Sequence, residues 1–232
     1  MSRTVKYSFT ALVIIIIIFS LMGCAATIPR QPLSMEQVIA HEYEYSTEKG
    51  KELSSKYHGN LENIFTSIRA EYSHEELEFV PIQKREDGKY TGGLFFGKDL
   101  SENSDMLCLY IQGRTVNAFN TLQTDFNKRA VTVFSKYILN LVKISIAEED
   151  LFKDSDVSGI AISLGWWARD FILNRYYGGT VEYFTIIATK EDCKKFVNME
   201  ISNQDFANRS KITGGQGNTF LGKIELDLRQ IL

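Results

Sequence analysis

The stretch DFNKRAVTVFSKYILNLVKISI, residues 125–146, decides the fold class. Its apolar side chains recur every three or four residues, which predicts one long helix. The stripe consists of Phe126, Ala130, Val133, Phe134, Tyr137, Leu141 and Ile144, widened by Val131, Ile138 and Val142. So broad an apolar surface suits a helix that packs deep against a sheet.

Strand patterns flank this helix on both sides. On its N-terminal side, residues 106–111 are apolar on both faces and predict a central strand. Residues 77–82 contain Pro81 and predict an edge strand, while Gly92-Gly93 within 90–96 suggests a bulge or a close backbone approach. On its C-terminal side the predicted strands are 157–164, 181–188 and the alternating run 224–228.

Helix signals complete the pattern. Ser34 to Gln37 fits a capping box, and a stripe from Leu61 to Tyr72 predicts a second N-terminal helix. Residues 166–177 read as a helix ended by Gly178, and further starts are predicted at Thr189 and Ser202. We therefore expect one α+β domain over residues 34–232, with a mixed, mainly antiparallel sheet and packed helices after an N-terminal helical region.

Composition excludes several classes of protein. The chain has 232 residues and a net charge of −3, so it lacks the basic footprint of a nucleic-acid binder. Aromatic residues make up 12%, which argues against disorder, and three cysteines are too few for a disulfide scaffold. We expect Cys108 and Cys193 to be two buried free thiols; the alternative is a disulfide between them, since an exported domain meets oxidising conditions.

The first 23 residues have the layout of an export signal. Arg3 and Lys6 give a positive start, and an uninterrupted apolar run covers residues 11–19. That run is shorter than the roughly 20 residues of a membrane-spanning helix, although an uncleaved anchor that extends to Ile28 is an alternative.

The end of this segment, Leu21-Met22-Gly23-Cys24, resembles the lipobox of bacterial lipoproteins. The resemblance covers these first 24 residues alone. It implies cleavage before Cys24, lipidation of its sulfur, a signal peptide over 1–23 and a lipidated tether over 24–33. Ala25, in place of Asp, resembles the outer-membrane class, which would face the periplasm.

No catalytic constellation stands out in the rest of the chain. His41, His58 and His74 lack the spacing of a metal site, no histidine follows them, and no cofactor motif is present, so we predict neither metal nor cofactor. Residues 213–218 are rich in glycine and read as a hairpin or connecting loop.

A candidate binding surface lies in the segment with both tryptophans. Trp, Tyr and Arg are enriched at binding hot spots, and aromatic rings also stack on sugars. The candidates are Trp166, Trp167, Arg169, Arg175, Tyr176 and Tyr177. The alternative is structural, with Trp166 and Phe171 in the core.

These observations lead to three hypotheses of different classes. The first is a non-catalytic envelope lipoprotein, held to the membrane through Cys24 and binding an envelope protein or peptidoglycan. The second is a membrane-tethered hydrolase of cell-wall glycan or peptide, which needs two carboxylates in a cleft near Trp166 or Trp167. The third is a lipid-carrier module, which needs a large apolar cavity between sheet and helix.

Overall fold

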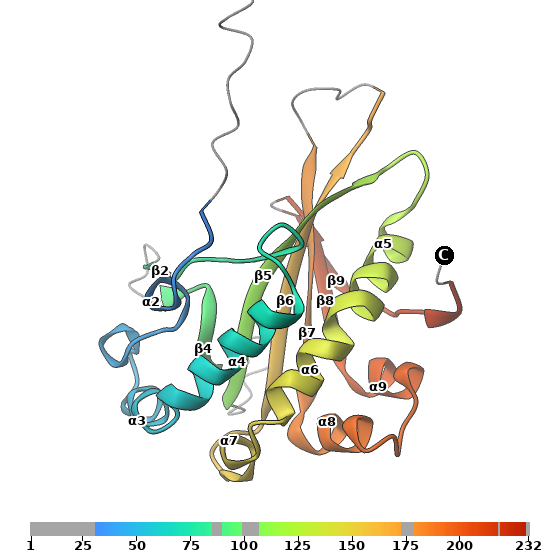
Figure 1. Ribbon diagram of the computed structural model, residues 1–232. Helices are drawn as coiled ribbons and strands as arrows, with labels where there is room; N and C mark the ends of the chain where they lie inside the picture. Colours follow the sequence, from blue (N-terminus) through green and yellow to red (C-terminus); the bar gives the residue numbers. More distant parts are fainter. Residues whose placement is uncertain (1–30, 85–89, 99–106, 173–178, 218, 231–232) are drawn as a thin grey trace, which may run out of the picture. The chain divides into compact units, whose positions relative to one another are not determined.

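The computed structural model describes residues 31–84, 90–98, 107–172, 179–217 and 219–230 (Figure 1). From Leu33 to Leu232 the chain forms one compact unit. This unit is a mixed α+β domain with an open, mostly antiparallel sheet, as the sequence predicted.

The sheet is centred on two long parallel strands, β5 and β6. β1 and β4 lie along the free edge of β5, and β7, β8 and β9 follow β6 in that order. β5 and β6 are parallel, while every other neighbouring pair in this sheet is antiparallel. The strands are β1 (Leu77–Phe79), β4 (Gly93–Lys98), β5 (Leu107–Asn120), β6 (Gly159–Arg169), β7 (Thr180–Thr189), β8 (Lys211–Gln216) and β9 (Thr219–Lys223). A separate pair joins β2 (Gln83–Lys84) to β3 (Tyr90–Thr91).

The larger helices cover one face of the sheet (Figure 1). The crossover between the parallel strands carries α5 (Phe126–Val133), α6 (Leu139–Ile146) and α7 (Glu149–Lys153). Beside it lie α4 (His58–Glu71), α8 (Lys190–Val197) and α9 (Asn203–Arg209). The remaining helical segments are α2 (Met35–Val38), the turn η1 (Glu42–Glu44), α3 (Glu48–Lys56) and the final turn η3 (Leu228–Gln230).

The predicted central helix is present, with one irregularity. Asp125 caps its start by accepting a hydrogen bond from the Lys128 backbone N–H at 2.8 Å. Most of its apolar stripe is buried, including Phe134 and Leu141, each at 0% exposure, while Phe126 and Ile144 near its two ends are partly buried. Residues 134–138 form a π-helical turn, η2, between α5 and α6. Such a turn adds a residue locally and shifts the faces of the helix that follows.

The helix predicted over residues 166–177 is wrong at its start, because residues up to Arg169 belong to β6. β6 is hydrogen-bonded to β5 on one side and β7 on the other, and this pairing overrides the helical spacing. Residues 170–172 are not helical either, since Phe171 and Ile172 lie in a turn, and the rest, residues 173–178 with the expected cap Gly178, lies outside the described residues.

The strand predicted over residues 224–228 is also wrong. β9 ends at Lys223, and the chain then continues without a ladder into η3. Ile224 and Leu226 are nevertheless buried, at 8% and 4% exposure. The alternation therefore indicated burial correctly, but among the described residues the pairing with β8 stops at the Ile224 N–H, which donates to the Ile212 carbonyl at 2.9 Å.

At the N-terminal side, the capping box at Ser34 is present, but the helix it starts has one turn. Ile39 leaves the helix to form a parallel bridge with Leu94 of β4. The predicted close approach at Gly93 allows this bridge, because a glycine leaves room for the Val38 carbonyl beside its Cα. The polar residues beyond form α3, capped by Thr47.

Candidate functional site

A cavity of about 540 Å³ lies where the N-terminal segment passes the outer edge of β4. Small-molecule sites commonly span roughly 300–1,000 Å³. Its apolar lining consists of Ala40, Tyr45, Ile82, Phe95, Phe96, Gly97 and Leu107. Its polar lining consists of Glu44, Ser46, Thr47, Lys49, Thr91, Lys98 and Asp156. We call this cavity the β4-edge pocket.

The N-terminal segment is held in place by backbone contacts. The Ala40 N–H donates to the Leu94 carbonyl at 3.0 Å, and Ser54 Oγ donates to the Ala40 carbonyl at 3.0 Å. After this the chain turns away from β4 through η1. The Tyr45 hydroxyl returns to accept from the Phe96 N–H at 3.0 Å, and its burial raises the pKa of Tyr45 to about 12. The pocket is the space left between this loop and the strand edge.

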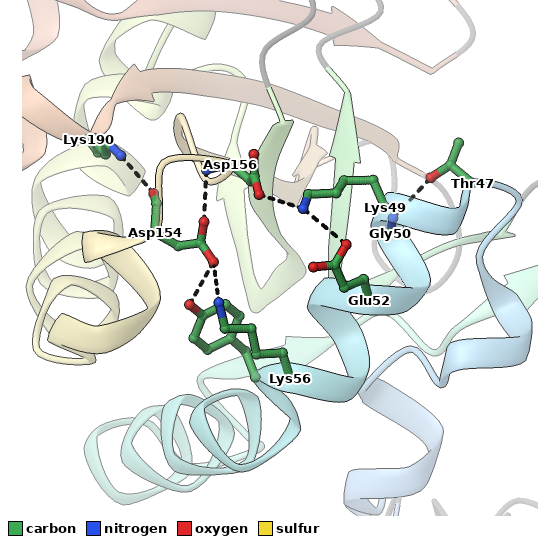
Figure 2. Close-up of polar contacts among 9 residues, drawn as sticks. Thr47, Lys49, Gly50, Glu52, Lys56, Asp154, Asp156 and Lys190 are labelled. Carbon is green, nitrogen blue, oxygen red and sulfur yellow. Dashed lines mark hydrogen bonds and ion pairs between the residues drawn. The ribbon is translucent and has the colours of Figure 1, made fainter.

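A charged pair lies at the pocket and joins two distant segments (Figure 2). Lys49 Nζ contacts Asp156 at 2.5 Å and Glu52 at 3.0 Å. The hydrogen bond to Asp156 raises the pKa of Lys49. Since Lys49 belongs to α3 and Asp156 to the loop before β6, the pair closes the pocket wall across more than a hundred residues of sequence.

Asp154 anchors the same loop just beside the pocket (Figure 2). Its carboxylate accepts from Lys56 Nζ at 2.9 Å, the Tyr57 hydroxyl at 2.8 Å and the Asp156 N–H at 2.9 Å. Its side chain is 8% exposed. The hydrogen bond from Lys56 is the largest of the causes that hold the pKa of Asp154 well below its usual range. Asp154 therefore acts as a fixed structural acceptor.

Trp166 does not lie on the surface, which excludes it from the candidate binding surface and agrees with the structural interpretation. It is 1% exposed, and its indole N–H donates to Glu182 at 2.7 Å. Glu182 is itself buried and takes two hydrogen bonds from Arg129, at 2.7 and 2.8 Å. A third guanidinium contact goes to the Thr124 carbonyl. The composition suggested a surface, but strand alternation directs Trp166 toward α5 and the core.

Trp167 and Arg169 point to the face opposite Trp166, since side chains alternate along a strand. Both are half-buried, and the Arg169 guanidinium lies 5.3 Å from the Trp167 ring centroid. Phe171, the other proposed core residue, is 47% exposed. Arg175, Tyr176 and Tyr177 lie outside the described residues, as does Cys24.

The alternative disulfide between the two cysteines is not formed. Cys108 and Cys193 are both buried free thiols, and burial raises the pKa of Cys193. The structure thus has the expected arrangement, in which each thiol behaves as a small apolar side chain.

Metal binding finds no support in the part of the chain that the structure describes, where no three His, Cys, Asp or Glu side chains gather. Across those same residues, no helix is long and apolar enough to span a membrane. No sequence pattern predicted the pocket residues, because they come from segments near residues 45, 95 and 156, which share no motif.

Comparison with known proteins gives no relative. No protein family, no curated protein and no solved structure matches this chain. The residues themselves are therefore the grounds for a functional proposal.

Proposed function

We propose that this chain is a lipid-anchored lipoprotein of a bacterial cell envelope, whose α+β domain binds a ligand or partner beside the membrane without catalysing a reaction. The observation that carries the proposal is Leu21-Met22-Gly23-Cys24 at the end of an export-signal layout. Two or more acyl chains on one cysteine would hold the protein stably at a bilayer. Ala25 favours the outer membrane, facing the periplasm.

The β4-edge pocket supports binding as the role of the domain. Half of its lining residues are apolar and they supply most of the wall surface, which suits an apolar group. Its two carboxylates already have structural partners: Asp156 pairs with Lys49, and Glu44 accepts from the His41 N–H at 2.7 Å. Such an arrangement favours holding a ligand over activating a water molecule.

The lipid-carrier hypothesis gains one specific observation, since this pocket lies between the sheet edge and α3 and has apolar walls. The hydrolase hypothesis has less structural support. Glu44 and Asp156 do line the pocket, but neither tryptophan does, and the hypothesis required carboxylates near one of them. After an envelope protein or peptidoglycan, a lipid or another apolar ligand is therefore the second candidate for what the domain binds.

The anchor is tested by the mass of the mature N-terminus and by membrane fractionation. Wild-type protein should begin at Cys24, carry acyl groups and sediment with membranes. The variant Cys24→Ala should lack the acyl mass and leave the membrane fraction. Ala26→Ser, two residues away, serves as the matched control and should behave as wild type. Wild-type protein with an unmodified Cys24 would refute the proposal.

A further inference from the structure

Most of the exposed large apolar side chains among the described residues lie at one end of the sheet. β5 and β6 both finish there, at Asn120 and Arg169, and the Thr121 N–H donates to the Arg169 carbonyl at 2.8 Å. The β8–β9 turn reaches the same end, because the Gly217 N–H donates to the Val181 carbonyl at 2.7 Å. The exposed apolar residues on these segments are Val116, Leu122, Phe171, Ile172, Phe220 and Leu221. We call them the apolar sheet end.

This end is also poor in charge. Within residues 116–124, 169–172, 179–181 and 213–222, the sequence contains two charged residues, Arg169 and Asp170, although 24% of the whole chain is charged. The opposite end of the sheet contrasts sharply, since residues 148–156 and 190–195 are mostly Lys, Asp and Glu. Exposed apolar side chains that gather on a surface poor in charge mark a site of contact with an apolar partner.

The tether limits which partner is within reach. Cys24 precedes Leu33 by nine residues with two prolines, an extended reach of about 28 Å. The chain joins the sheet beside Gly93, which is paired with Gln112 of β5. From Gln112 to Asn120, β5 rises by about 26 Å. The tether is thus long enough for Cys24 to sit in the plane of the apolar sheet end, and too short to carry the domain far from the bilayer.

We propose that the apolar sheet end rests on the lipid bilayer that holds Cys24, with Phe171 and Ile172 at the level of the acyl chains. The inference builds on the proposed lipid anchor. Acyl chains at Cys24 supply the attachment, and the apolar sheet end fixes the orientation of the domain. The charged end, and the face with Trp167, then stay accessible to partners.

The test places a fluorophore at each end of the domain. Ile172→Cys and, as matched control, Met199→Cys are labelled with a polarity-sensitive dye; Ile172 is 70% exposed and Met199 is 90% exposed. Met199 lies in the turn between α8 and α9, and α8 follows β7 at the end of the sheet opposite to Thr180. Cys108 and Cys193 are buried, which directs the label to the introduced thiol. The full-length processed lipoprotein is reconstituted into vesicles of phosphatidylethanolamine and phosphatidylglycerol.

We expect the label at position 172 to shift to shorter wavelength and to lose most of its intensity to a quencher carried on the lipid tails. The label at position 199 should do neither. Equal behaviour of the two labels would overturn the inference, as would a shift at 172 without lipid quenching, which indicates cover by protein. The mass of Cys24 in the same sample separates the two proposals: an acylated Cys24 with an unquenched label at 172 refutes the orientation alone, whereas an unmodified Cys24 refutes the anchor and the orientation with it.

Discussion

The contact between Trp166, Glu182 and Arg129 shows how one buried acid is stabilised. Glu182 is 1% exposed, yet it accepts hydrogen bonds from two residues of different elements. A buried carboxylate without such partners would be strongly unfavourable, because it would lose its hydration without compensation. The three side chains also fix α5 against β6 and β7.

Substitution of Arg129 by Met should therefore destabilise the domain by about 3–5 kcal/mol, since the Glu182 carboxylate would stay buried with its guanidinium partner removed. The free energy of unfolding, measured by urea titration, checks this. Lys136→Met is the control: Lys136 pairs with Glu76 at 3.5 Å with both side chains half-exposed, so its loss should cost less than about 1 kcal/mol. Equal effects of the two variants would contradict the structural role of Glu182.

The hydrogen-bonded carboxylate of Asp154 should make the stability of the domain depend on pH. Its pKa in the folded protein lies below the usual 3.8, so the folded state binds its proton less readily than the unfolded state does. The contribution of Asp154 is therefore complete above about pH 5 and is lost as pH falls through 3.8 toward the folded pKa. Asp154→Asn should lower the free energy of unfolding at pH 7 by about 1.5–3 kcal/mol, the range for hydrogen bonds to charged groups.

The difference in the free energy of unfolding between wild type and Asp154→Asn should then narrow as the pH is lowered below about 4, because the wild-type carboxylate becomes protonated. Urea titrations at about pH 7, 5 and 3 measure it. Asp150→Asn is the control, since the Asp150 side chain is 86% exposed and its contact with Lys153 is long, at 3.7 Å. A gap independent of pH would show that shape, and not charge, explains the effect of Asp154.

At the scale of elements, Gly93 fixes the junction between α2 and β4. Its φ of +60° and the overlap of any Cβ with the Val38 carbonyl both demand glycine. Gly222 offers a matched comparison, with a φ of +87° but open space where a Cβ would lie. Gly222→Ala should cost about 1–2 kcal/mol from backbone strain alone. Gly93→Ala should destabilise the domain clearly more than Gly222→Ala and should give the lower Tm. If the two variants lose the same stability, the close contact with the Val38 carbonyl does not contribute to the effect at Gly93.

Elements defined by short-range physics were predictable from sequence. The caps at Thr189 and Ser202, and the stripe of the central helix, depend on residues within a few positions of each other. The errors at residues 166–169 and 224–228 have one cause, which is that strand pairing depends on partners distant in sequence. The apolar spacing did not predict the π-helical turn at 134–138.

At the scale of the whole molecule, the candidate site was less predictable than the fold. The β4-edge pocket combines the N-terminal loop, β4 and the loop before β6, so its residues meet only after the sheet has formed. The aromatic and arginine cluster gave a misleading signal at Trp166, because the same residue types build cores and binding surfaces. The lipobox is a local signal and stays a prediction about residues outside those described.

Occupation of the β4-edge pocket should stabilise the whole domain, because a ligand that binds only the folded state shifts the unfolding equilibrium. At a concentration about 100 times its Kd, a ligand adds about 2.7 kcal/mol and raises Tm. An apolar fluorescent probe with one aromatic ring system should bind the wild type and raise its Tm in a concentration-dependent way. Ser46→Trp should abolish both effects, since Ser46 is exposed and lines the pocket. Ser67→Trp, on the exposed side of α4, should leave them intact. If the probe raises the Tm of both variants alike, it binds elsewhere, and the β4-edge pocket is not the ligand site.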